Sequence, residues 1–415
     1  LFALKSSLAR TATALSFFLE SNGHSVVELT ISPRLLALLE PRLTKNLQIR
    51  IYEGKEVKNV SFSHVLKLLL KSISHRVFRL FKKDRQSADI IVRGWVDVTE
   101  RLFPEEINNG LLLIYPFALG SMRQIKFIRS CSKRKIRYTL VGMPYNIQFI
   151  LKDIFFGVSA ERILFNAEMH ANRGHAKEIL RRFPRQIYSS DEYESGVFFL
   201  YEELLRAGVY AVNKAHGVGQ YCPYICYSEF RVLSESQADF YRSFNKEIQY
   251  SLIESDYTSI ALDSYSLSLE KTPAVVLIHQ PFKESLLYAE DEALHYLDSE
   301  LKKISKELGI KFFIKMHPNY SRSTLKNNNF IGTSIYDWHS LNSYRPIFIT
   351  INSSVYFELR GIGPILVYSE PTFFPSIYFP DKFMTVSREN IKSKIESVLN
   401  VDSWRCAAEQ HADNS

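Results

Sequence analysis

Short apolar segments of strand length alternate with amphipathic helical segments along most of this 415-residue chain, and this alternation restricts the fold more than any other feature. Strands that alternate with helices pair in parallel, because each crossover helix returns the chain to the same end of the sheet. Helices then cover both faces of the sheet, so the strands read as continuous apolar runs. The sequence therefore predicts an α/β protein built on parallel sheets.

The alternation occurs in two series. In the first, helices are predicted at 5–22 (after a short strand at 1–4), 121–134, 192–207 and 237–245, and strands at 25–31, 88–94, 110–119, 137–144, 209–217 and 230–236. In the second, strands are predicted at 274–280, 311–317, 346–352 and 364–370, and helices at 287–308, 353–362 and 388–399. No buried-strand pattern occurs over 246–272, where Ser, Tyr and Asp dominate.

This organisation predicts two Rossmann-like domains with parallel sheets facing a central cleft. Their expected extents are 1–250 for the first domain, 251–272 for a linker, 273–400 for the second domain and 401–415 for a tail. Ligands of such sheets bind outside the carboxyl ends of the strands, often where the strand order reverses. Polar residues that directly follow the predicted strands are therefore the candidates for a binding site.

The overall charge favours an anionic partner. Lys and Arg exceed Asp and Glu by 52 − 44 = +8, which suits a nucleotide, a phosphorylated acceptor, a nucleic acid or a membrane surface. No apolar run is long enough for a transmembrane helix, and no signal peptide is recognisable. The sequence starts at Leu1 rather than Met, which is compatible with an excised domain of a longer protein.

Two strands of the second series end in similar polar motifs. Lys315 and His317 end the strand at 311–317, and Pro318 stops it. Gln280 ends the strand at 274–280 and is followed by a proline and by Glu284. An imidazole or an ammonium group at this edge of a sheet can donate to a phosphate or a nucleotide oxygen. A single His-Pro pair at a strand end would indicate only a turn.

A serine pair follows a third strand of the second series. Ser353 and Ser354 come directly after the strand at 346–352 and begin the predicted helix at 353–362, which also carries Glu358. Free backbone N–H groups and hydroxyls at a helix start can hold a phosphate. A simple serine cap is the alternative interpretation for the pair, and a solvated helix residue is the alternative for Glu358.

Taken together, VVLIHQPFKES (275–285), IKMHPNY (314–320) and INSSVYFELRGIGPILVYSEPTF (351–373) resemble the carboxyl-terminal half of bacterial glycosyltransferases that build surface polysaccharides from CMP-activated acidic sugars. This group comprises capsule and O-antigen Kdo transferases and bacterial sialyl- and polysialyltransferases. The resemblance covers about 274–375. It implies the GT-B fold, with the nucleotide-sugar donor in the second domain.

The resemblance also implies residue roles. His317, Ser353 and Ser354 would bind CMP, Lys315 would add positive charge, and Gln280, Glu284, Pro318 and Glu358 would complete the donor site. The donor is then a substrate, and no cofactor or metal ion is expected. The chain has no compact Asp-x-Asp motif.

The first domain would bind the acceptor, a glycan or lipid-linked glycan, and would supply the catalytic groups. Asp191, Glu192 and Glu194 form an acidic cluster at the predicted start of the helix at 192–207, and His216 ends the strand at 209–217. The related sialyltransferases use an acidic pair followed by Gly as general base, which Glu194-Ser195-Gly196 matches only loosely. Acids in a first helical turn are also favoured by the helix dipole alone.

A basic amphipathic segment spans 65–85. Leu66, Leu69, Leu70, Ile73, Val77, Leu80 and Phe81 share one helical face, and six Lys and Arg residues lie away from it. Such a helix can lie on an anionic membrane. Packing of the apolar face on the first sheet is the favoured alternative. The membrane interpretation would place the protein in the cytoplasm, peripherally on the inner face of the cytoplasmic membrane.

Three other functions stay open. A polyol-phosphate transferase of the teichoic-acid type shares the fold and uses a CDP-polyol, and a UDP-sugar epimerase also has two such domains. A non-catalytic carbohydrate- or nucleic-acid-binding module is the alternative from another class. Because no recognisable nucleic-acid-binding motif occurs in the sequence, no nucleic-acid partner is expected.

Overall fold

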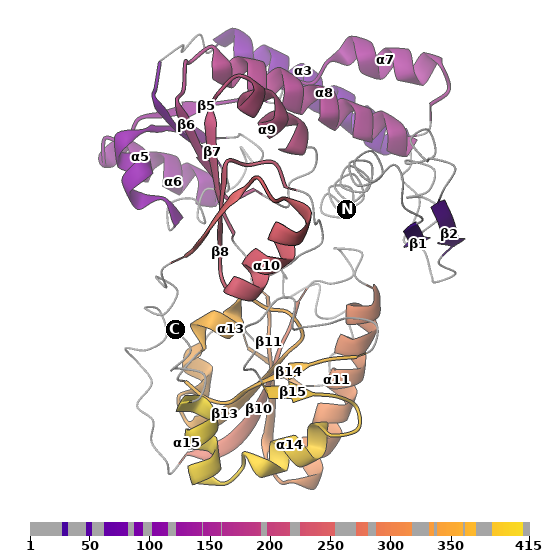
Figure 1. Cartoon of the computed structure of the whole chain (residues 1–415), viewed down its shortest axis with the longest axis vertical. Coiled ribbons are helices and arrows are strands. Elements are labelled where there is room, and N and C mark those ends of the chain that lie inside the picture. Colours follow the sequence, from indigo (N-terminus) through magenta and orange to yellow (C-terminus); the bar gives the residue numbers. More distant parts are fainter. Residues whose placement is uncertain are drawn as a thin grey trace. The chain divides into compact units, whose positions relative to one another are not determined.

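The computed structural model describes most of the chain (Figure 1). The described residues are 27–31, 47–51, 62–81, 87–93, 102–114, 122–142, 144–158, 160–191, 197–215, 225–253, 271–280, 288–317, 332–335, 338–359, 362–370 and 384–409. The chain divides into two compact units. Unit 1 comes mainly from residues up to 251, and unit 2 comes mainly from residues 252 onward, with two short earlier segments.

Unit 1 contains a seven-stranded sheet in the order β5-β4-β3-β6-β7-β8-β9. Its strands are β3 (Ile90–Arg93), β4 (Leu111–Ile114), β5 (Tyr138–Leu140), β6 (Gln186–Ser189), β7 (Tyr210–Lys214), β8 (Glu229–Val232) and β9 (Gln249–Leu252). From β5 to β8 each neighbouring pair is parallel. A separate parallel pair joins β1 (Val27–Ile31) and β2 (Leu47–Ile51).

The helices of unit 1 are α3 (Phe62–Phe81), α5 (Pro104–Asn109), α6 (Met122–Lys133), α7 (Ile147–Phe155), α8 (Ala160–Leu180) and α9 (Val197–Arg206). Helix α10 (Glu235–Phe244) is divided, with its first six residues in unit 2 and the rest in unit 1. Helices α3, α7 and α8 pack against one another, and Figure 1 shows them as one group. Helix α9 ends where Gly208 adopts a left-handed φ of 79°. The amide N–H groups of Gly208 and Val209 then satisfy the Leu205 and Leu204 carbonyls at 2.9 and 3.1 Å.

Unit 2 contains a six-stranded parallel sheet in the order β12-β11-β10-β13-β14-β15. Its strands are β10 (Thr272–Ile278), β11 (Lys311–Lys315), β12 (Thr333–Ile335), β13 (Tyr344–Thr350), β14 (Ile365–Tyr368) and β15 (Met384–Val386). Its helices are α11 (Tyr288–Glu307), the 3-10 helix η5 (Trp338–Leu341), α13 (Val355–Glu358), α14 (Ile391–Ser397) and α15 (Val401–Glu409).

Both faces of the unit 2 sheet are buried, as expected for parallel strands. On one face the sheet packs against apolar residues of α11, α14 and α15. On the other face it packs against η5 and α13. Strand β14 is buried at every residue, which explains why its sequence shows an unbroken apolar run.

The predicted α/β class is confirmed, and every predicted strand that falls on described residues is present. The predicted helix at 5–22, the strand at 1–4 and most of the predicted linker lie outside the described residues. Strand β9 was not predicted, because its side chains are exposed or half-buried and carry no apolar pattern. Strand β6 was also missed, although it is central in the sheet.

Two predictions in unit 2 are wrong. The helix predicted at 353–362 is the four-residue α13. The segment predicted as a tail at 401–415 includes α15, whose Trp404 is 3% exposed. The Trp404 indole N–H donates to the Pro346 carbonyl at 2.9 Å. One buried aromatic residue therefore fixes this last helix on the sheet.

A third correction concerns α3. The packing that was favoured for its apolar face does not occur at Leu66, Leu70 and Ile73, which are exposed. Helix α3 instead buries Val65 and Leu68 and contacts α7 and α8.

Trp404→Ala is expected to lower the free energy of unfolding by about 3–5 kcal/mol, because it removes a buried aromatic side chain and leaves a cavity. Urea unfolding followed by circular dichroism measures the change. The matched control is Arg405→Ala, since Arg405 is exposed on the same helix. Equal unfolding midpoints for the two variants would contradict the packing of α15.

Candidate functional site

The strand order of unit 2 reverses between β10 and β13. From β10 the chain continues outward to β11 and β12, and it then returns to the other side of β10 to form β13, β14 and β15. In open α/β sheets, ligands generally bind outside the carboxyl ends of the two strands between which the strand order reverses. The sequence-predicted residues Gln280, Lys315, His317 and Ser353 all lie at or just after the carboxyl ends of β10, β11 and β13.

Strand register brings several of these residues to one level. Ile278 pairs with Lys315, and the His279 amide N–H donates to the Lys315 carbonyl at 2.9 Å, which extends the pairing of β10 and β11. Continuation of this register places Gln280 level with His317. Continuation of the β10–β13 register, in which Leu277 pairs with Ile349, places Asn352 level with Gln280. The carboxyl edge at the reversal is therefore a row of polar residues.

Lys315 is the cation of this row. Its side chain is 9% exposed, and its ammonium nitrogen lies 4.7 Å from the centroid of the Trp338 ring. An aromatic face attracts a cation through the ring quadrupole, most strongly for Trp. Trp338 thus stabilises a charge that burial would otherwise disfavour.

Two histidines accompany Lys315, and both are uncharged at neutral pH. Burial, with a contribution from the nearby charge of Lys315, lowers the pKa of His317 to about 4. Burial lowers the pKa of His279 to about 3, and His317 and His295 add to this effect. A neutral imidazole presents one N–H donor and one acceptor. The cluster therefore combines the positive charge of Lys315 with two neutral hydrogen-bonding rings.

His279 was not predicted as a site residue. The sequence did carry a signal, because β10 leads into His279-Gln280-Pro281 and β11 leads into Met316-His317-Pro318. A histidine just before a proline-terminated strand end thus occurs on both neighbouring strands.

The serine pair has a different setting from the predicted one. Because α13 is only four residues long, its dipole is small and contributes little to anion binding. Ser353 is buried, its Oγ accepts a hydrogen bond from the Val355 amide at 3.3 Å, and its own amide donates to Thr350 Oγ1 at 3.2 Å. Ser354 caps α13 without a side-chain hydrogen bond, and both it and Glu358 are half-buried.

Asn352 is a second residue that the sequence did not single out. It is 4% exposed, and neither its amide nitrogen nor its amide oxygen has a hydrogen-bond partner among the described residues. An unsatisfied buried amide is costly and calls for an explanation, such as a ligand or an ordered water. Its position beside Ser353 at the reversal of the sheet makes it a candidate member of the site.

Five predicted site residues lie outside the described residues. They are Glu192, Glu194, His216, Glu284 and Pro318.

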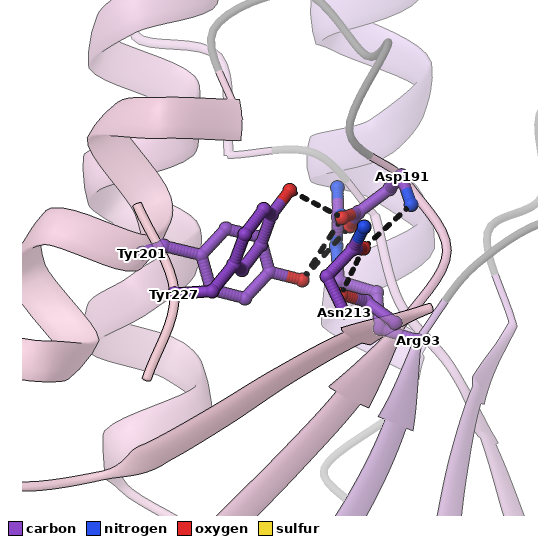
Figure 2. A network of polar contacts seen from close by, with 6 residues as sticks. Arg93, Asp191, Tyr201, Asn213 and Tyr227 are labelled. Carbon is purple, nitrogen blue, oxygen red and sulfur yellow. Dashed lines mark hydrogen bonds and ion pairs between the residues drawn. The ribbon is translucent and has the colours of Figure 1, made fainter. Parts of the chain in front are cut away.

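Asp191 is described, and it does not begin a helix as predicted. It follows β6, whereas α9 starts only at Val197. Asp191 is fully buried and forms an ion pair with Arg93, which is 2% exposed. The Tyr201 hydroxyl donates to both carboxylate oxygens at 2.9 and 3.1 Å, and the Tyr227 hydroxyl lies 3.4 Å from one of them (Figure 2).

The network around Asp191 occupies the point where the unit 1 sheet reverses, between β3 and β6. Arg93 on β3, Ser189 on β6 and Asn213 on β7 are in register across three neighbouring strands. The Asn213 side-chain oxygen accepts from Ser189 Oγ at 3.0 Å and from the Asp191 amide at 3.1 Å (Figure 2). Asp191 is thus held by strand ends and by two tyrosines from elsewhere in unit 1.

This setting suits a positioning role better than proton transfer. A general base must reach the proton that it removes, and both carboxylate oxygens of Asp191 already accept hydrogen bonds inside the protein. Arg93, Tyr201 and Tyr227 were not singled out from the sequence, since an isolated Arg or Tyr in an apolar segment carries no motif. Among the described residues, no three His, Cys, Asp or Glu side chains are grouped so as to hold a metal ion.

Neither a protein-family profile nor a curated protein matches the sequence. Among solved structures, the apo form of OtsA is 9% identical with a TM-score of 0.50, over 78% of this chain and 94% of that one. A UDP-forming α,α-trehalose-phosphate synthase from Burkholderia vietnamiensis is 10% identical with a TM-score of 0.49, over 78% and 94% of the two chains.

MurG from Acinetobacter baumannii is 9% identical with a TM-score of 0.45, over 79% of this chain and 95% of that one. At such low identity the similarity concerns the fold alone. With two parallel-sheet α/β units and the structural similarity to OtsA, the chain has the GT-B fold.

Asp191→Ala is expected to lower the free energy of unfolding by about 3–5 kcal/mol, because Arg93 would stay buried without its counter-charge. Tyr201→Phe should lower it by about 1.5–3 kcal/mol through the loss of hydrogen bonds to a carboxylate. Urea unfolding measures both changes. The control is Asp89→Ala, since the ion pair of Asp89 with Arg185 lies on the surface and should have no measurable effect. An Asp191→Ala variant as stable as this control would refute the buried network.

Proposed function

We propose that the protein is a glycosyltransferase that moves an acidic sugar from its CMP-activated donor to a growing cell-surface polysaccharide or lipid-linked glycan. Kdo is the first candidate sugar and sialic acid the second. The observation that carries the proposal is the group formed by His279, Gln280, Lys315 and His317 at the reversal of the unit 2 sheet. The resemblance of 274–375 to enzymes that use CMP-sugars supports the choice of donor.

In the proposed reaction, the bond between the sugar and the phosphate of CMP breaks, and the phosphate gains a second negative charge. Lys315 and the N–H donors of the neutral imidazoles stabilise this developing charge. Such groups accelerate the reaction to the extent that they interact more strongly with the transition state than with the bound donor. The proposed chemistry uses no cofactor and no metal ion.

Hydroxyl and amide groups complete the proposed donor site. Ser353 Oγ accepts from an amide but still has its own proton to donate, and Ser354 supplies a second hydroxyl. The unsatisfied Asn352 amide can both donate to and accept from a nucleotide. Gln280, Glu284, Pro318 and Glu358 are proposed to complete the contacts to the base and ribose.

For the acceptor, we assign the catalytic base to Glu192, Glu194 or His216. Asp191 instead forms an ion pair with Arg93 and accepts a hydrogen bond from the Tyr201 hydroxyl. We therefore assign it the role of a positioning residue rather than that of the base. A glycan or lipid-linked acceptor implies a cytoplasmic enzyme that works at the inner face of the cytoplasmic membrane. No nucleic acid is proposed as a partner.

A donor screen tests the proposal. The protein is incubated with CMP-Kdo, CMP-sialic acid, CDP-glycerol or UDP-sugars, and release of the free nucleotide is followed. Release of CMP from one of the two CMP-sugars is expected, together with binding of that donor by calorimetry. Turnover of CDP-glycerol alone would identify a polyol-phosphate transferase, and turnover of UDP-sugars alone would exclude the proposed donor. If no nucleotide bound, a non-catalytic module would be favoured.

Lys315→Met is expected to reduce kcat about 10²–10³-fold, because it removes a charge that stabilises the leaving phosphate. His317→Ala and Ser354→Ala should weaken donor binding. Steady-state kinetics with the accepted donor measure all three effects. Lys311→Met is the matched control, because Lys311 is exposed at the opposite end of the same strand. Unchanged donor binding in both the His317 and the Ser354 variants would exclude the proposed phosphate contacts.

Donor affinity is expected to stay constant between pH 6 and 8, because His279 and His317 are neutral throughout this range. Calorimetric titration at several pH values measures it. A loss of affinity as the pH rises through about 6.5, the usual pKa of histidine, would show instead that a charged imidazole binds the phosphate.

The same pKa shift affects stability. An unfolded histidine titrates near 6.5 and His317 near 4, so between these values the unfolded state binds more protons and stability falls as the pH is lowered. This loss, on the order of 3 kcal/mol, should be absent from the His317→Asn variant. Its free energy of unfolding should therefore fall less steeply than that of the wild type as the pH is lowered from 6.5 to 4.

A further inference from the structure

Helix α3 exposes a stripe of large apolar side chains. Phe62, Leu66, Leu70 and Ile73 are 58%, 56%, 59% and 50% exposed. With 3.6 residues per turn, these four positions fall within an arc of about 80° on the helix surface. Single exposed apolar residues are common and need no explanation. A continuous stripe over three turns is different, since contiguous apolar surface marks an interaction site.

The orientation of α3 is fixed by its other side. Val65 and Leu68 are buried, and the hydroxyl of the buried Ser72 donates to the Leu68 carbonyl at 2.7 Å. Helix α3 packs in this way against α7 and α8. The exposed stripe is thus a second apolar face in addition to the one that belongs to the core.

Helix α7, which contacts α3, also exposes large apolar side chains. Leu151, Phe155 and Phe156, at and just after its last turn, are 51%, 85% and 67% exposed. The ammonium group of the exposed Lys152 lies 5.9 Å from the Phe156 ring centroid. Two neighbouring helices therefore both present aromatic or aliphatic side chains beside a lysine.

The charge on α3 and the two residues after it has one sign. The sequence from 62 to 83 contains six Lys and Arg residues and no Asp or Glu, and Lys67 is exposed beside the stripe. An apolar stripe next to basic residues is typical of helices that lie in the interface of an anionic bilayer. Long basic side chains can keep their charge at the level of the lipid phosphates while the apolar ones enter the acyl boundary. None of the described helices has the length and apolarity needed to span a bilayer.

We propose that α3 and α7 form a docking surface for an anionic lipid bilayer. The surface consists of Phe62, Leu66, Leu70 and Ile73 on α3 and of Leu151, Phe155 and Phe156 on or next to α7. Its apolar side chains insert at the headgroup boundary, and Lys67 and Lys152 contact lipid phosphates. This inference does not rest on the proposed sugar transfer, because it follows from exposure and charge alone.

Vesicle co-sedimentation of the full chain, without donor or acceptor, tests the inference. Vesicles of phosphatidylcholine containing 30% phosphatidylglycerol are compared with vesicles of phosphatidylcholine alone. The wild type should bind the anionic vesicles more tightly, and this binding should weaken with salt. Leu66→Gln with Leu70→Gln should reduce it about tenfold or more, through loss of apolar insertion. Phe155→Ser with Phe156→Ser tests the part played by α7 and should also reduce it.

Two further variants make the result specific. Leu252→Gln is the matched control, because Leu252 is 49% exposed on β9 and lies outside the proposed surface, so it should bind as the wild type does. Lys67→Gln leaves the apolar stripe intact and should weaken binding to anionic vesicles about fivefold. Urea unfolding midpoints confirm that each variant is folded.

Three results would overturn the inference. The first is a wild type that binds neither type of vesicle. The second is a Leu66→Gln, Leu70→Gln variant that binds like the Leu252→Gln control. The third is a wild-type oligomer, seen by analytical ultracentrifugation, that this double variant dissociates without a change in vesicle binding, since the stripe would then be an interface between copies of the chain.

Discussion

Strand β10 pairs with β11 on one side and with β13 on the other, and the whole of unit 2 depends on this central parallel pairing. It joins Thr272 to Tyr344, which are far apart in the sequence, and it buries apolar residues of β10 on both faces of the sheet. Because all strands run the same way, their carboxyl ends meet at one edge. Polar residues placed after separate strands are thereby collected into one row, with Lys315 and His317 beside His279 and Gln280.

The residues at the reversal points of the two sheets differ in their electrostatics. In unit 1 the charges of Arg93 and Asp191 neutralise each other, and tyrosine hydroxyls satisfy the remaining carboxylate positions. In unit 2, the Lys315 ammonium lies over the Trp338 ring, and its charge adds to the effect of burial on the pKa of His317. A buried lysine at the carboxyl edge of a sheet is suited to bind an anion, whereas the Arg93 charge is already compensated by Asp191. This difference in electrostatics is why the nucleotide is proposed to bind unit 2.

Burial also explains how the histidines of unit 2 act. Removal of water disfavours the charged form of an imidazole, and the nearby Lys315 disfavours it further. Among the described residues of this edge, Lys315 thus carries the positive charge while both imidazoles stay neutral. The exposed stripe of α3 shows the reverse situation, since Lys67 stays in water next to side chains that would be more stable out of it.

The sequence by itself determined the α/β class and most strands, because strand length and apolar runs are local properties that parallel burial imposes on each segment. It also indicated Gln280, Lys315, His317 and Ser353, since polar residues after buried strands must reach the carboxyl edge. Only the tertiary structure decided that Asp191 is enclosed by Arg93, Tyr201 and Tyr227, that Trp404 holds a helix where a tail was predicted, and that Leu66 and Leu70 face solvent. Each of these depends on which distant segments pack together, and the pattern within a single segment does not predict such packing.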